Sequence, residues 1–332
     1  MTTYHYPIKK PLESILVFGA SAHIGGPLAR HVADNAPGVR LRLATSSQAK
    51  AEKLKIDFPK AEVVVADYYD LPSMRAATKG MEGVFLVSPD FLDEHIAMAV
   101  FRRAVTDNGV VRHVIRILAD PPGVTLHHVP KEMHAFGGGT AIQNLIAKDF
   151  LEKTDLPITY LNSAGWYFDN YMTWLAPPIL NKRTLTMSAP RRVLYFDPRE
   201  LGEVAARIFL SDDARHIGGS YQCDNGQDLT SFEEAAALMS EIFGVKIAYD
   251  GSDEGFMREI GEPARAYWSN VGVFANGQDP AEYFLAYWRF EQANENAWRR
   301  TDFAGRILGR TPRSLRQWLT ENRDFFIKGM GV

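Results

Sequence analysis

A short apolar run that leads directly into a glycine-bearing turn constrains this chain more than any other feature. Ile15-Leu16-Val17-Phe18 has the composition of a buried strand, and a segment with helical spacing follows Gly19-Ala20-Ser21-Ala22-His23-Ile24-Gly25-Gly26. Gly19 can make a tight turn, and Gly25 lets the helix pack closely on the strand. The free amides at the helix start suit an anionic group. We predict that this turn binds the pyrophosphate of a dinucleotide, through Gly19, Ser21, Ala22, His23, Ile24 and Gly25.

The alternation of β-branched runs and helical segments continues along the first half of the chain. Strands are predicted at residues 14–18, 40–45, 62–66, 83–87, 113–118 and 158–162. Helices are predicted at residues 26–35, 48–55, 71–79, 90–108 and 140–154. Short strands that alternate with helices specify a parallel sheet with helices on both faces. We therefore expect an α/β protein with a doubly wound parallel Rossmann sheet.

A smaller lobe is expected beside this sheet. The regular alternation stops in residues 119–139, which are rich in Pro, His and Gly, and a loop after a fifth strand borders the ligand crevice of such a sheet. Two aromatic-rich stretches follow, near residues 166–174 and 267–290. We expect residues 1–162, together with 189–249, to form the Rossmann domain, and residues 163–188 and 250–332 to form the substrate lobe. The aromatic content favours a small apolar or aromatic substrate.

The bulk composition argues against several other classes of protein. The 332 residues carry a net charge of -3, which gives no basic surface for direct nucleic-acid binding. The single cysteine, Cys223, cannot form an intrachain disulfide. The sequence has neither a signal-peptide start nor an apolar run of membrane-spanning length. We expect a cytoplasmic protein that does not enter a membrane, and the sequence leaves its oligomeric state open.

The glycine turn and several later segments resemble one family. The spacing Gly19-x-x-Ala22-x-x-Gly25 is similar to the G-x-x-G-x-x-G turn of extended and atypical short-chain dehydrogenases, more specifically the NmrA-like group. The later segments are Val65-Ala66-Asp67-Tyr68, Val84-Phe85-Leu86-Val87-Ser88-Pro89, Leu156-Pro157-Ile158-Thr159-Tyr160 with Ala164-Gly165-Trp166-Tyr167, and Asp197-Pro198-Arg199-Glu200-Leu201-Gly202. Their shared order and spacing extend the resemblance over most of the chain.

The resemblance implies a nicotinamide dinucleotide and further residues that contact it. Asp67 and Tyr68 would border the adenine. The segment that passes under the nicotinamide ribose would be Val87, Ser88 and Pro89. Ala22 stands where the family has its middle glycine, and its extra methyl group is compatible with binding if position 22 does not need a positive φ.

The tip of the second predicted strand indicates which nicotinamide dinucleotide binds. NAD-specific Rossmann sites usually place an acid about 20 residues past the glycine turn, where it accepts the ribose hydroxyls. Here Ala44-Thr45-Ser46-Ser47-Gln48 contains no acid. The hydroxyls of Ser46 and Ser47, with Lys50 or Arg42 nearby, suit a 2′-phosphate, so NADP is predicted and NAD is the alternative. Lys50 can equally belong to a solvated helix face.

The catalytic groups of related reductases are absent from their expected positions. The wider family uses a Tyr with a Lys four residues later, or a Lys on the helix after the fifth strand. The sole Y-x-x-x-K match, Tyr6 to Lys10, precedes the first strand, and Asn144 stands where isoflavone-reductase-like members carry Lys. Asn can donate a hydrogen bond but cannot exchange a proton near neutral pH. Ile117 and Leu118 occupy the place of the fifth-strand Ser or Thr.

Other residues are candidates for proton transfer. Among the loop histidines, His128 or His134 can serve as a general acid because histidine titrates near neutrality, although loop histidines are commonly only solvated. Tyr167 can present a phenol to the nicotinamide region or belong to the core. No metal site is predicted, because the histidine pair lacks a convincing third ligand.

Two functions are compatible with these features. The first is an NADP-dependent oxidoreductase that transfers a hydride to or from an apolar, preferably aromatic carbonyl, alkene or benzylic substrate, with Tyr167, His128 and Asn144 at the reacting centre. The second is a dinucleotide-binding redox sensor or regulator without turnover. The aromatic-rich lobe favours the enzyme, whereas the missing Tyr and Lys favour the sensor.

Overall fold

The centre of the molecule is a seven-stranded parallel sheet. The computed structural model describes residues 7–134, 140–163, 165–269, 274 and 277–332. The strands are β1 (Ser14–Phe18), β2 (Arg40–Thr45), β3 (Glu62–Val65), β4 (Gly83–Leu86), β5 (His113–Leu118), β6 (Ile158–Ser163) and β10 (Ser220–Cys223). They lie in the order β10-β6-β5-β4-β1-β2-β3, and every pairing is parallel. The order reverses between β1 and β4, which places the ligand crevice beyond the carboxyl ends of these strands.

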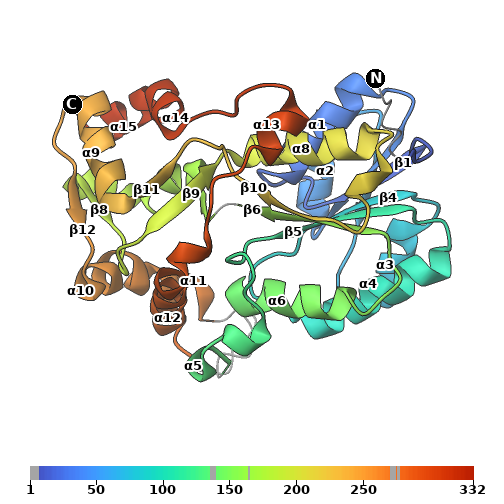
Figure 1. Ribbon diagram of the computed structural model, residues 1–332, viewed down its shortest axis with the longest axis horizontal. Helices are drawn as coiled ribbons and strands as arrows, with labels where there is room; N and C mark the ends of the chain where they lie inside the picture. Colours follow the sequence, from blue (N-terminus) through green and yellow to red (C-terminus); the bar gives the residue numbers. More distant parts are fainter. Residues whose placement is uncertain (1–6, 135–139, 164, 270–273, 275–276) are drawn as a thin grey trace, which may run out of the picture.

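Helices cover both faces of this sheet (Figure 1). One face carries α1 (Gly25–Asn35), α2 (Gln48–Asp57), α8 (Pro198–Leu210) and α13 (Phe303–Leu308), and the other carries α3 (Leu71–Thr78), α4 (Glu94–Asn108) and α6 (Thr140–Leu151). Alternate residues of β1 point to opposite faces. Ile15 and Val17 join the core with α1 and α8, whereas Leu16 and Phe18 join the core with α3 and α4. The predicted doubly wound α/β fold is thereby confirmed.

The predicted elements are present with some differences. The helix expected from residue 90 begins at Glu94 instead, because the Asp93 side chain accepts hydrogen bonds from the amides of His95 and Ile96 and caps the helix there. The strand β10 was not predicted, since its sequence Ser-Tyr-Gln-Cys shows no apolar run. No helix within the described segments is long and apolar enough to span a bilayer.

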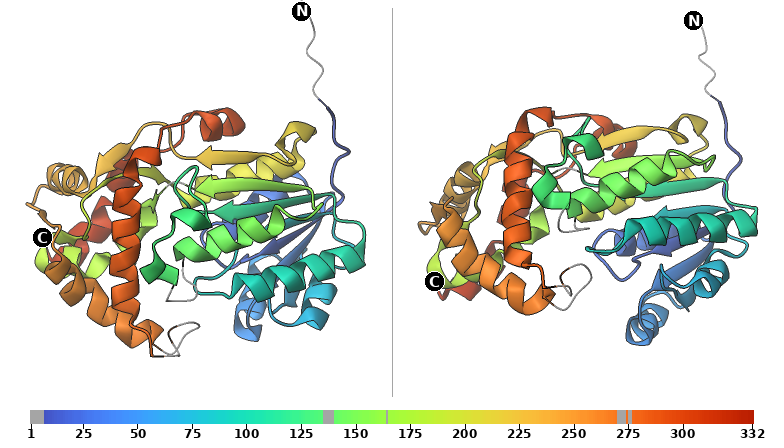
Figure 2. Two further views of the ribbon diagram at one scale, coloured as in Figure 1. Left: turned by 60° about the horizontal axis from the view of Figure 1, so that its bottom comes forward. Right: turned by 90° about the horizontal axis from the view of Figure 1, so that it is seen from below.

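A lobe with its own core lies beside the sheet (Figure 2). Its strands form a three-stranded sheet of β7 (Trp166–Tyr167), β9 (Arg192–Phe196) and β11 (Leu229–Ser231), and a pair of β8 (Thr184–Thr186) and β12 (Ala248–Asp250). Its helices are α5 (Lys131–His134), α7 (Ala176–Lys182), α9 (Phe232–Phe243), α10 (Asp253–Phe256), α11 (Glu262–Trp268), α12 (Pro280–Ala293), α14 (Leu315–Glu321) and α15 (Arg323–Met330). Short 3-10 or π turns are η1 (Leu126–His128), η2 (Phe168–Met172), η3 (Ala214–His216), η4 (Met257–Gly261) and η6 (Glu295–Ala297).

Most aromatic side chains of the two aromatic-rich stretches are buried in the core of this lobe. They include Trp166, Phe168, Tyr171, Tyr283 and Trp288. Large rings of this kind dominate the energetics of a small core. The aromatic density of the sequence therefore reflects packing first, and it does not by itself define a substrate pocket.

Residues 189–249 contribute to both parts of the molecule. In this segment α8 and β10 pack with the seven-stranded sheet, whereas β9 and β11 lie in the three-stranded sheet and α9 packs in the lobe core. The chain also returns to the Rossmann side near its end, because Trp298 and α13 join the core that contains α8.

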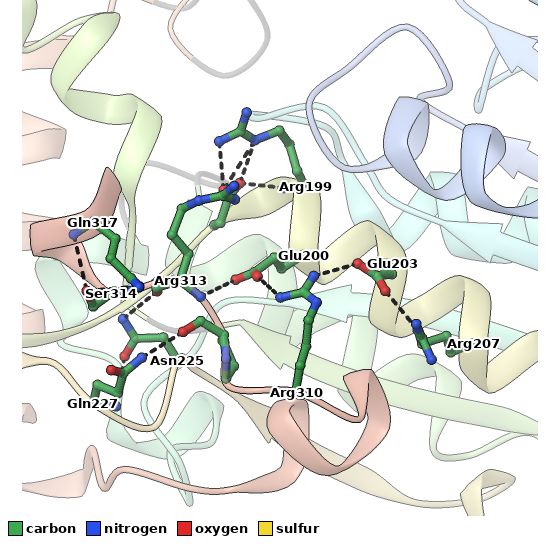
Figure 3. A network of polar contacts seen from close by, with 12 residues as sticks. Arg199, Glu200, Glu203, Arg207, Asn225, Gln227, Arg310, Arg313, Ser314 and Gln317 are labelled. Carbon is green, nitrogen blue, oxygen red and sulfur yellow. Dashed lines mark hydrogen bonds and ion pairs between the residues drawn. The ribbon is translucent and has the colours of Figure 1, made fainter. Parts of the chain in front are cut away.

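Ion pairs fasten this C-terminal segment to the start of α8 (Figure 3). Arg310 lies between Glu200 and Glu203 and pairs with both carboxylates. Arg313 Nη1 lies 2.9 Å from Asp197 Oδ2, and the Arg313 amide donates to Glu200 Oε2 over 2.9 Å. The network fixes the N-terminal half of α8, which lies against the start of α1.

Candidate dinucleotide-binding and active site

Gly19 turns the chain from β1 toward α1. Its φ is 65°, a left-handed conformation that favours glycine, and a Cβ at this position would lie 2.8 Å from Val87 Cγ1. The Ala22 amide donates to the Gly19 carbonyl oxygen over 2.9 Å and closes the turn. Ala22 does not have a positive φ. Its methyl group therefore causes no backbone strain in place of the family's middle glycine.

Two further glycines let three segments approach closely. A Cβ on Gly25 would lie 2.4 Å from the Gly19 carbonyl oxygen, so the first turn of α1 touches the end of β1 directly. A Cβ on Gly202 of α8 would lie 2.4 Å from the Ile24 carbonyl oxygen. Side chains at these positions would push the helix start away from the strand end.

The start of α1 is open to an anion. Its N-cap residue, Ile24, makes no side-chain capping hydrogen bond, and Ser21, Ala22 and His23 are exposed just before it. The Gly26 amide donates to the Ala22 carbonyl oxygen over 3.0 Å and Pro27 has no amide hydrogen, so an anion at this helix start meets amides that precede Gly26, where the helix dipole attracts negative charge. An uncapped helix start behind a glycine turn therefore fits the pyrophosphate of a dinucleotide.

The tip of β2 presents hydroxyl groups and an exposed lysine. Ser46 and Lys50 are exposed, while Ser47 caps α2 by accepting a hydrogen bond from the Lys50 amide over 3.4 Å. The expectation for Arg42 is wrong: its buried guanidinium pairs with Glu62 at 2.8 Å and donates to carbonyl oxygens at the end of α3. Arg42 lies within β2, so its side chain covers a face of the sheet and does not reach the carboxyl ends of the strands, where the dinucleotide is expected.

A wide depression adjoins the glycine turn. Its volume is about 800 Å³, and residues of the turn, α1, α2 and α8 line it. Ser21 and Lys50 both lie on its wall, as does Lys53. The depression thus connects the glycine turn to α2, whereas Ser46 and Ser47 at the β2 tip are not among the residues that line it.

The two residues expected to border the adenine have different surroundings. Asp67 is exposed and accepts a hydrogen bond from the Tyr69 amide over 2.9 Å. Tyr68 donates its hydroxyl hydrogen to the Val87 carbonyl oxygen over 2.7 Å, and its ring centroid lies 5.1 Å from that of Phe18. Burial raises the pKa of Tyr68. Tyr68 therefore braces the ends of β1 and β4, and Asp67 keeps its carboxylate at the surface.

The half-buried Ser88 and the exposed Pro89 contact a network of buried polar side chains that was not apparent in the sequence. Arg116 on β5 donates from Nη1 to Ser88 Oγ over 2.7 Å and pairs with Glu94 at 2.9 Å. The Arg116 and Glu94 side chains are 1% and 0% exposed, so this ion pair is fully desolvated. Gln143 Nε2 donates to the Pro89 carbonyl oxygen over 2.6 Å. The network fixes the segment after β4.

Asn144 takes part in the same network. Its Oδ1 accepts a hydrogen bond from Arg116 Nη2 over 3.4 Å. A lysine at this position would put a second cation beside the Arg116 guanidinium, which like-charge repulsion disfavours. The guanidinium that Asn144 contacts comes from β5, and Glu94 neutralises its charge.

Tyr167 lies next to the glycine turn. Its ring packs against the His23 ring with centroids 5.2 Å apart, and its hydroxyl is hydrogen-bonded to Ser163 at the end of β6. Burial raises the pKa of Tyr167, so the phenol stays protonated at neutral pH and acts as a hydrogen-bond donor. His23 Nδ1 also lies 2.6 Å from Asp169 Oδ2 in η2. His23 therefore connects the glycine turn to the lobe.

The loop histidines occupy two short helical turns after β5. His128 ends η1, where its Nδ1 accepts a hydrogen bond from the Thr125 amide over 3.1 Å, and His134 ends α5. Both are exposed. In the parts of the chain that are described, no group of three His, Cys, Asp or Glu side chains is placed to hold a metal ion. Tyr6 of the Tyr6–Lys10 match lies outside the described residues.

Comparison with known proteins decides the family. The NmrA-like family model matches residues 11–277, which is most of the chain. The chain belongs to the NmrA-like family. The resemblance found in the sequence is confirmed.

Relatives of this NmrA-like protein include reductases and a regulator. The (4-alkanoyl-5-oxo-2,5-dihydrofuran-3-yl)methyl phosphate reductase of Streptomyces griseus is 25% identical over 94% of this chain and 99% of its own. The structure of Citrobacter sp. triphenylmethane reductase with NADP(H) has a TM-score of 0.71 at 21% identity, covering 93% of this chain and 99% of that one. The negative transcriptional regulator NmrA in complex with NAD has a TM-score of 0.65 at 15% identity, covering 97% and 99%. The two structures show the shared fold.

This NmrA-like chain also gathers buried polar groups that the sequence analysis missed. Asp120, Arg191 and Glu291 are 5%, 3% and 2% exposed, and each has side-chain atoms without a hydrogen-bond partner among the described residues. The indole nitrogens of Trp166 and Trp288 are likewise buried without a partner there. Each such group costs about 1–3 kcal/mol, which favours a ligand that completes the hydrogen bonds. An Asp two residues past the end of a buried strand was the available signal for Asp120.

Proposed function

We propose that this protein is an NADP-dependent oxidoreductase that transfers a hydride to or from an apolar, preferably aromatic carbonyl, alkene or benzylic carbon. The observation that carries the proposal is the cradle of Gly19 and Gly25, where a Cβ would collide, directly before the uncapped start of α1. Such a cradle suits a dinucleotide. The fold is that of a reductase described with NADP(H), which supports the same cofactor here.

The residues around the cradle support NADP over NAD. The β2 tip offers Ser46, Ser47 and the exposed Lys50 and no carboxylate, so nothing there repels a 2′-phosphate. At the other end, Ser88 Oγ accepts a hydrogen bond from Arg116 and keeps its own O–H for the nicotinamide ribose. Asp67 would lie beside the adenine.

When bound, the reduced nicotinamide supplies the hydride, and the protein orients the substrate and assists its charge. The protonated phenol of Tyr167 would donate a hydrogen bond to the substrate oxygen. Asn144 would hold the polar network at the same edge of the sheet. His128, which is exposed, would exchange protons with water.

The substrate would lie between the carboxyl ends of the parallel strands and the lobe of residues 163–188 and 250–332. The curated relative is named for an alkanoyl-oxo-dihydrofuran phosphate, a small molecule with an acyl chain and polar groups. The buried and incompletely paired guanidinium of Arg191 suits an oxygen of such a molecule. Apolar carbons would face the aromatic side chains of the lobe.

A second candidate function is a dinucleotide-binding regulator without turnover. It is favoured by Asn144 in place of a proton-transferring lysine, and the regulator NmrA shares the fold. A regulator needs different affinities for the two redox states of its ligand, because only differential binding shifts a conformational equilibrium.

A substrate panel distinguishes the two functions. The protein would be mixed with NADPH and aromatic ketones, enones or quinones, and with NADP and benzylic alcohols, while the reduced-nicotinamide absorbance is followed. We expect turnover of at least one compound, and its loss when Tyr167→Phe and His128→Ala are combined. Absence of turnover across the panel, with clearly unequal affinities for NADPH and NADP, would support the regulator and contradict the enzyme.

A further inference from the structure

Asp120 stands just past the carboxyl end of β5, with its backbone fixed on both sides. Its amide donates to Asn162 Oδ1 over 3.0 Å, and Asn162 Nδ2 donates to its carbonyl oxygen over 2.7 Å. Asn162 lies in β6, the neighbour of β5. Two strand ends therefore set the position of Asp120, at the edge of the sheet where ligands bind in doubly wound folds.

The Asp120 carboxyl group has no hydrogen-bond partner among the residues that the structure describes. The residue is 5% exposed, and both Oδ1 and Oδ2 are buried without a hydrogen bond to any described residue. A structural carboxylate in such a place is normally paired, since an unpaired buried charge is strongly destabilising. Asp224, directly after β10, shows the usual arrangement: its oxygens accept hydrogen bonds from the Gly226 amide and from Thr301.

Charged groups from three elements act on Asp120. Burial raises its pKa well above the ordinary value, and the negative charge of Glu291 on α12 raises it further. Lys148 on α6 and Arg116 on β5 oppose this effect and do not outweigh it. Tyr287, also on α12, is close enough for its own pKa to respond to the charge of Asp120. Burial and Glu291 thus favour the protonated form of this carboxyl group, whose two oxygens have no hydrogen-bond partner among the described residues.

We propose that Asp120 is the proton donor of the reduction, giving its carboxyl proton to the oxygen of a ketone or enone substrate. Asp120 has this role only if the protein is the reductase proposed above. Arg116, which Asn144 contacts, holds Ser88 in the segment after β4, at the same carboxyl ends of the strands. The unpaired carboxyl group and the hydride acceptor would then meet beyond β5.

Reduction of a ketone requires one hydride and one proton. A hydride from the reduced nicotinamide forms a C–H bond at the carbonyl carbon, and the C=O π bond breaks toward oxygen. The oxygen takes the Asp120 proton and becomes a hydroxyl group, which leaves an oxidised nicotinamide and an Asp120 carboxylate. Asp120 regains a proton from water before the next turnover.

The other candidates are less suited to this step. Burial raises the pKa of the Tyr167 phenol, so this group is a hydrogen-bond donor and a weak acid. His128 is exposed and already uses Nδ1 to cap η1. A neutral carboxyl group gives up its proton more readily than a buried phenol.

The first test is Asp120→Asn in the full chain, with a compound that the wild type reduces. We expect kcat to fall by about 10²- to 10⁴-fold, while the dissociation constant for NADPH stays within about twofold. Asp224→Asn is the matched control: it also removes a buried carboxyl group after a strand of the same sheet, and kcat should not change. For the wild type, kcat should fall as pH rises through the pKa of Asp120, and Asp120→Asn should lose this dependence.

The second test does not depend on activity. In protein labelled with ¹³C at the Asp side-chain carboxyl, the signal that disappears in Asp120→Asn should be that of a protonated acid at pH 7. Glu291→Gln should lower its titration midpoint, because a negative neighbour is removed. An ionised Asp120 at pH 7, or wild-type kcat in Asp120→Asn, would overturn the donor role alone. Absence of any turnover by the wild type would overturn the proposed reductase and the donor role with it.

Discussion

His23 Nδ1 lies 2.6 Å from Asp169 Oδ2, which joins the turn after β1 to the η2 segment of the lobe. The His23 ring also packs against Tyr167. The two paired side chains are 44% and 30% exposed, so the pair contributes about 1 kcal/mol at most to stability. The pair matters more for position than for stability, because Asp169 of the lobe holds His23 of the dinucleotide turn in place.

Asp169→Ala is therefore expected to weaken NADPH binding more than it weakens the fold. Releasing His23 leaves the turn to be ordered at the moment of binding, and we expect the dissociation constant to rise about threefold to tenfold. Calorimetric titration measures the affinity and thermal unfolding the stability. Asp302→Ala, which removes an exposed partner of Arg306 in α13, is the control. Unchanged NADPH affinity in Asp169→Ala would show that the pair does not position the turn.

Gly19→Val should abolish dinucleotide binding, whereas Ala22→Gly should preserve or improve it. At Gly19 a Cβ would approach Val87 to 2.8 Å at a φ of 65°, which a β-branched residue resists, while Ala22 meets no such constraint. Circular dichroism checks that both variants fold, and calorimetry measures NADPH binding. Normal binding by folded Gly19→Val would place the pyrophosphate elsewhere.

The wild type should bind NADPH with a micromolar dissociation constant, at least about tenfold tighter than NADH, a difference of about 1.4 kcal/mol. Lys50→Ala should reduce this preference by weakening NADPH binding while NADH binding stays unchanged. Lys55→Ala, on the same helix and paired with Glu52, is the control. Equal affinities of the wild type for the two cofactors would contradict the NADP assignment and leave the fold intact.

The dinucleotide turn could be predicted from the sequence because its determinants are local. Strand β1, Gly19, Gly25 and the start of α1 follow one another within a few residues, and each has a backbone or packing requirement that a residue type reveals. The β2 tip was equally accessible. Arg42 was misjudged, because only the register of β2 against β3 shows that its guanidinium reaches Glu62 and α3.

The polar groups at the carboxyl ends of β4 and β5 are arranged by contacts between residues that are far apart in the chain. Arg116 interrupts the apolar run from Val114 to Leu118, which is a visible signal, but its partner Glu94 lies on another element. The unusual state of Asp120 requires burial beside Glu291 of α12, and no local pattern connects these two positions. The aromatic residues are visible in the sequence, but their burial in the lobe core follows from contacts between distant segments.

Glu291 should make stability depend on pH. Burial raises its pKa from an ordinary 4.5 to about 7, so between these values the folded protein holds a proton that the unfolded chain releases. The contribution of this proton to the free energy of unfolding is fully present below pH 4.5. It is lost as pH rises toward 7, which lowers the free energy of unfolding by about 3 kcal/mol. The stability gain of Glu291→Gln over the wild type should thus be near zero at pH 4 and reach about 3 kcal/mol at pH 8, as measured by urea denaturation. Glu282→Gln, on the exposed side of α12, should follow the wild type. A gain that does not change with pH would mean that Glu291 is ionised in the folded protein.

The most direct measurement of the central claim is the transfer of deuterium from NADPH that carries the label at C4 of the nicotinamide. The two stereoisomers of this labelled cofactor would be incubated separately with the protein and the substrate panel, and the products analysed by mass spectrometry. We predict that at least one product gains a single deuterium, from one stereoisomer and not from the other, because a cofactor held by its pyrophosphate at Gly19–Gly25 and by its nicotinamide ribose at Ser88 turns one face of the nicotinamide toward the substrate. Products without deuterium from either stereoisomer, while labelled NADPH remains bound, would contradict the assignment of this protein as an oxidoreductase.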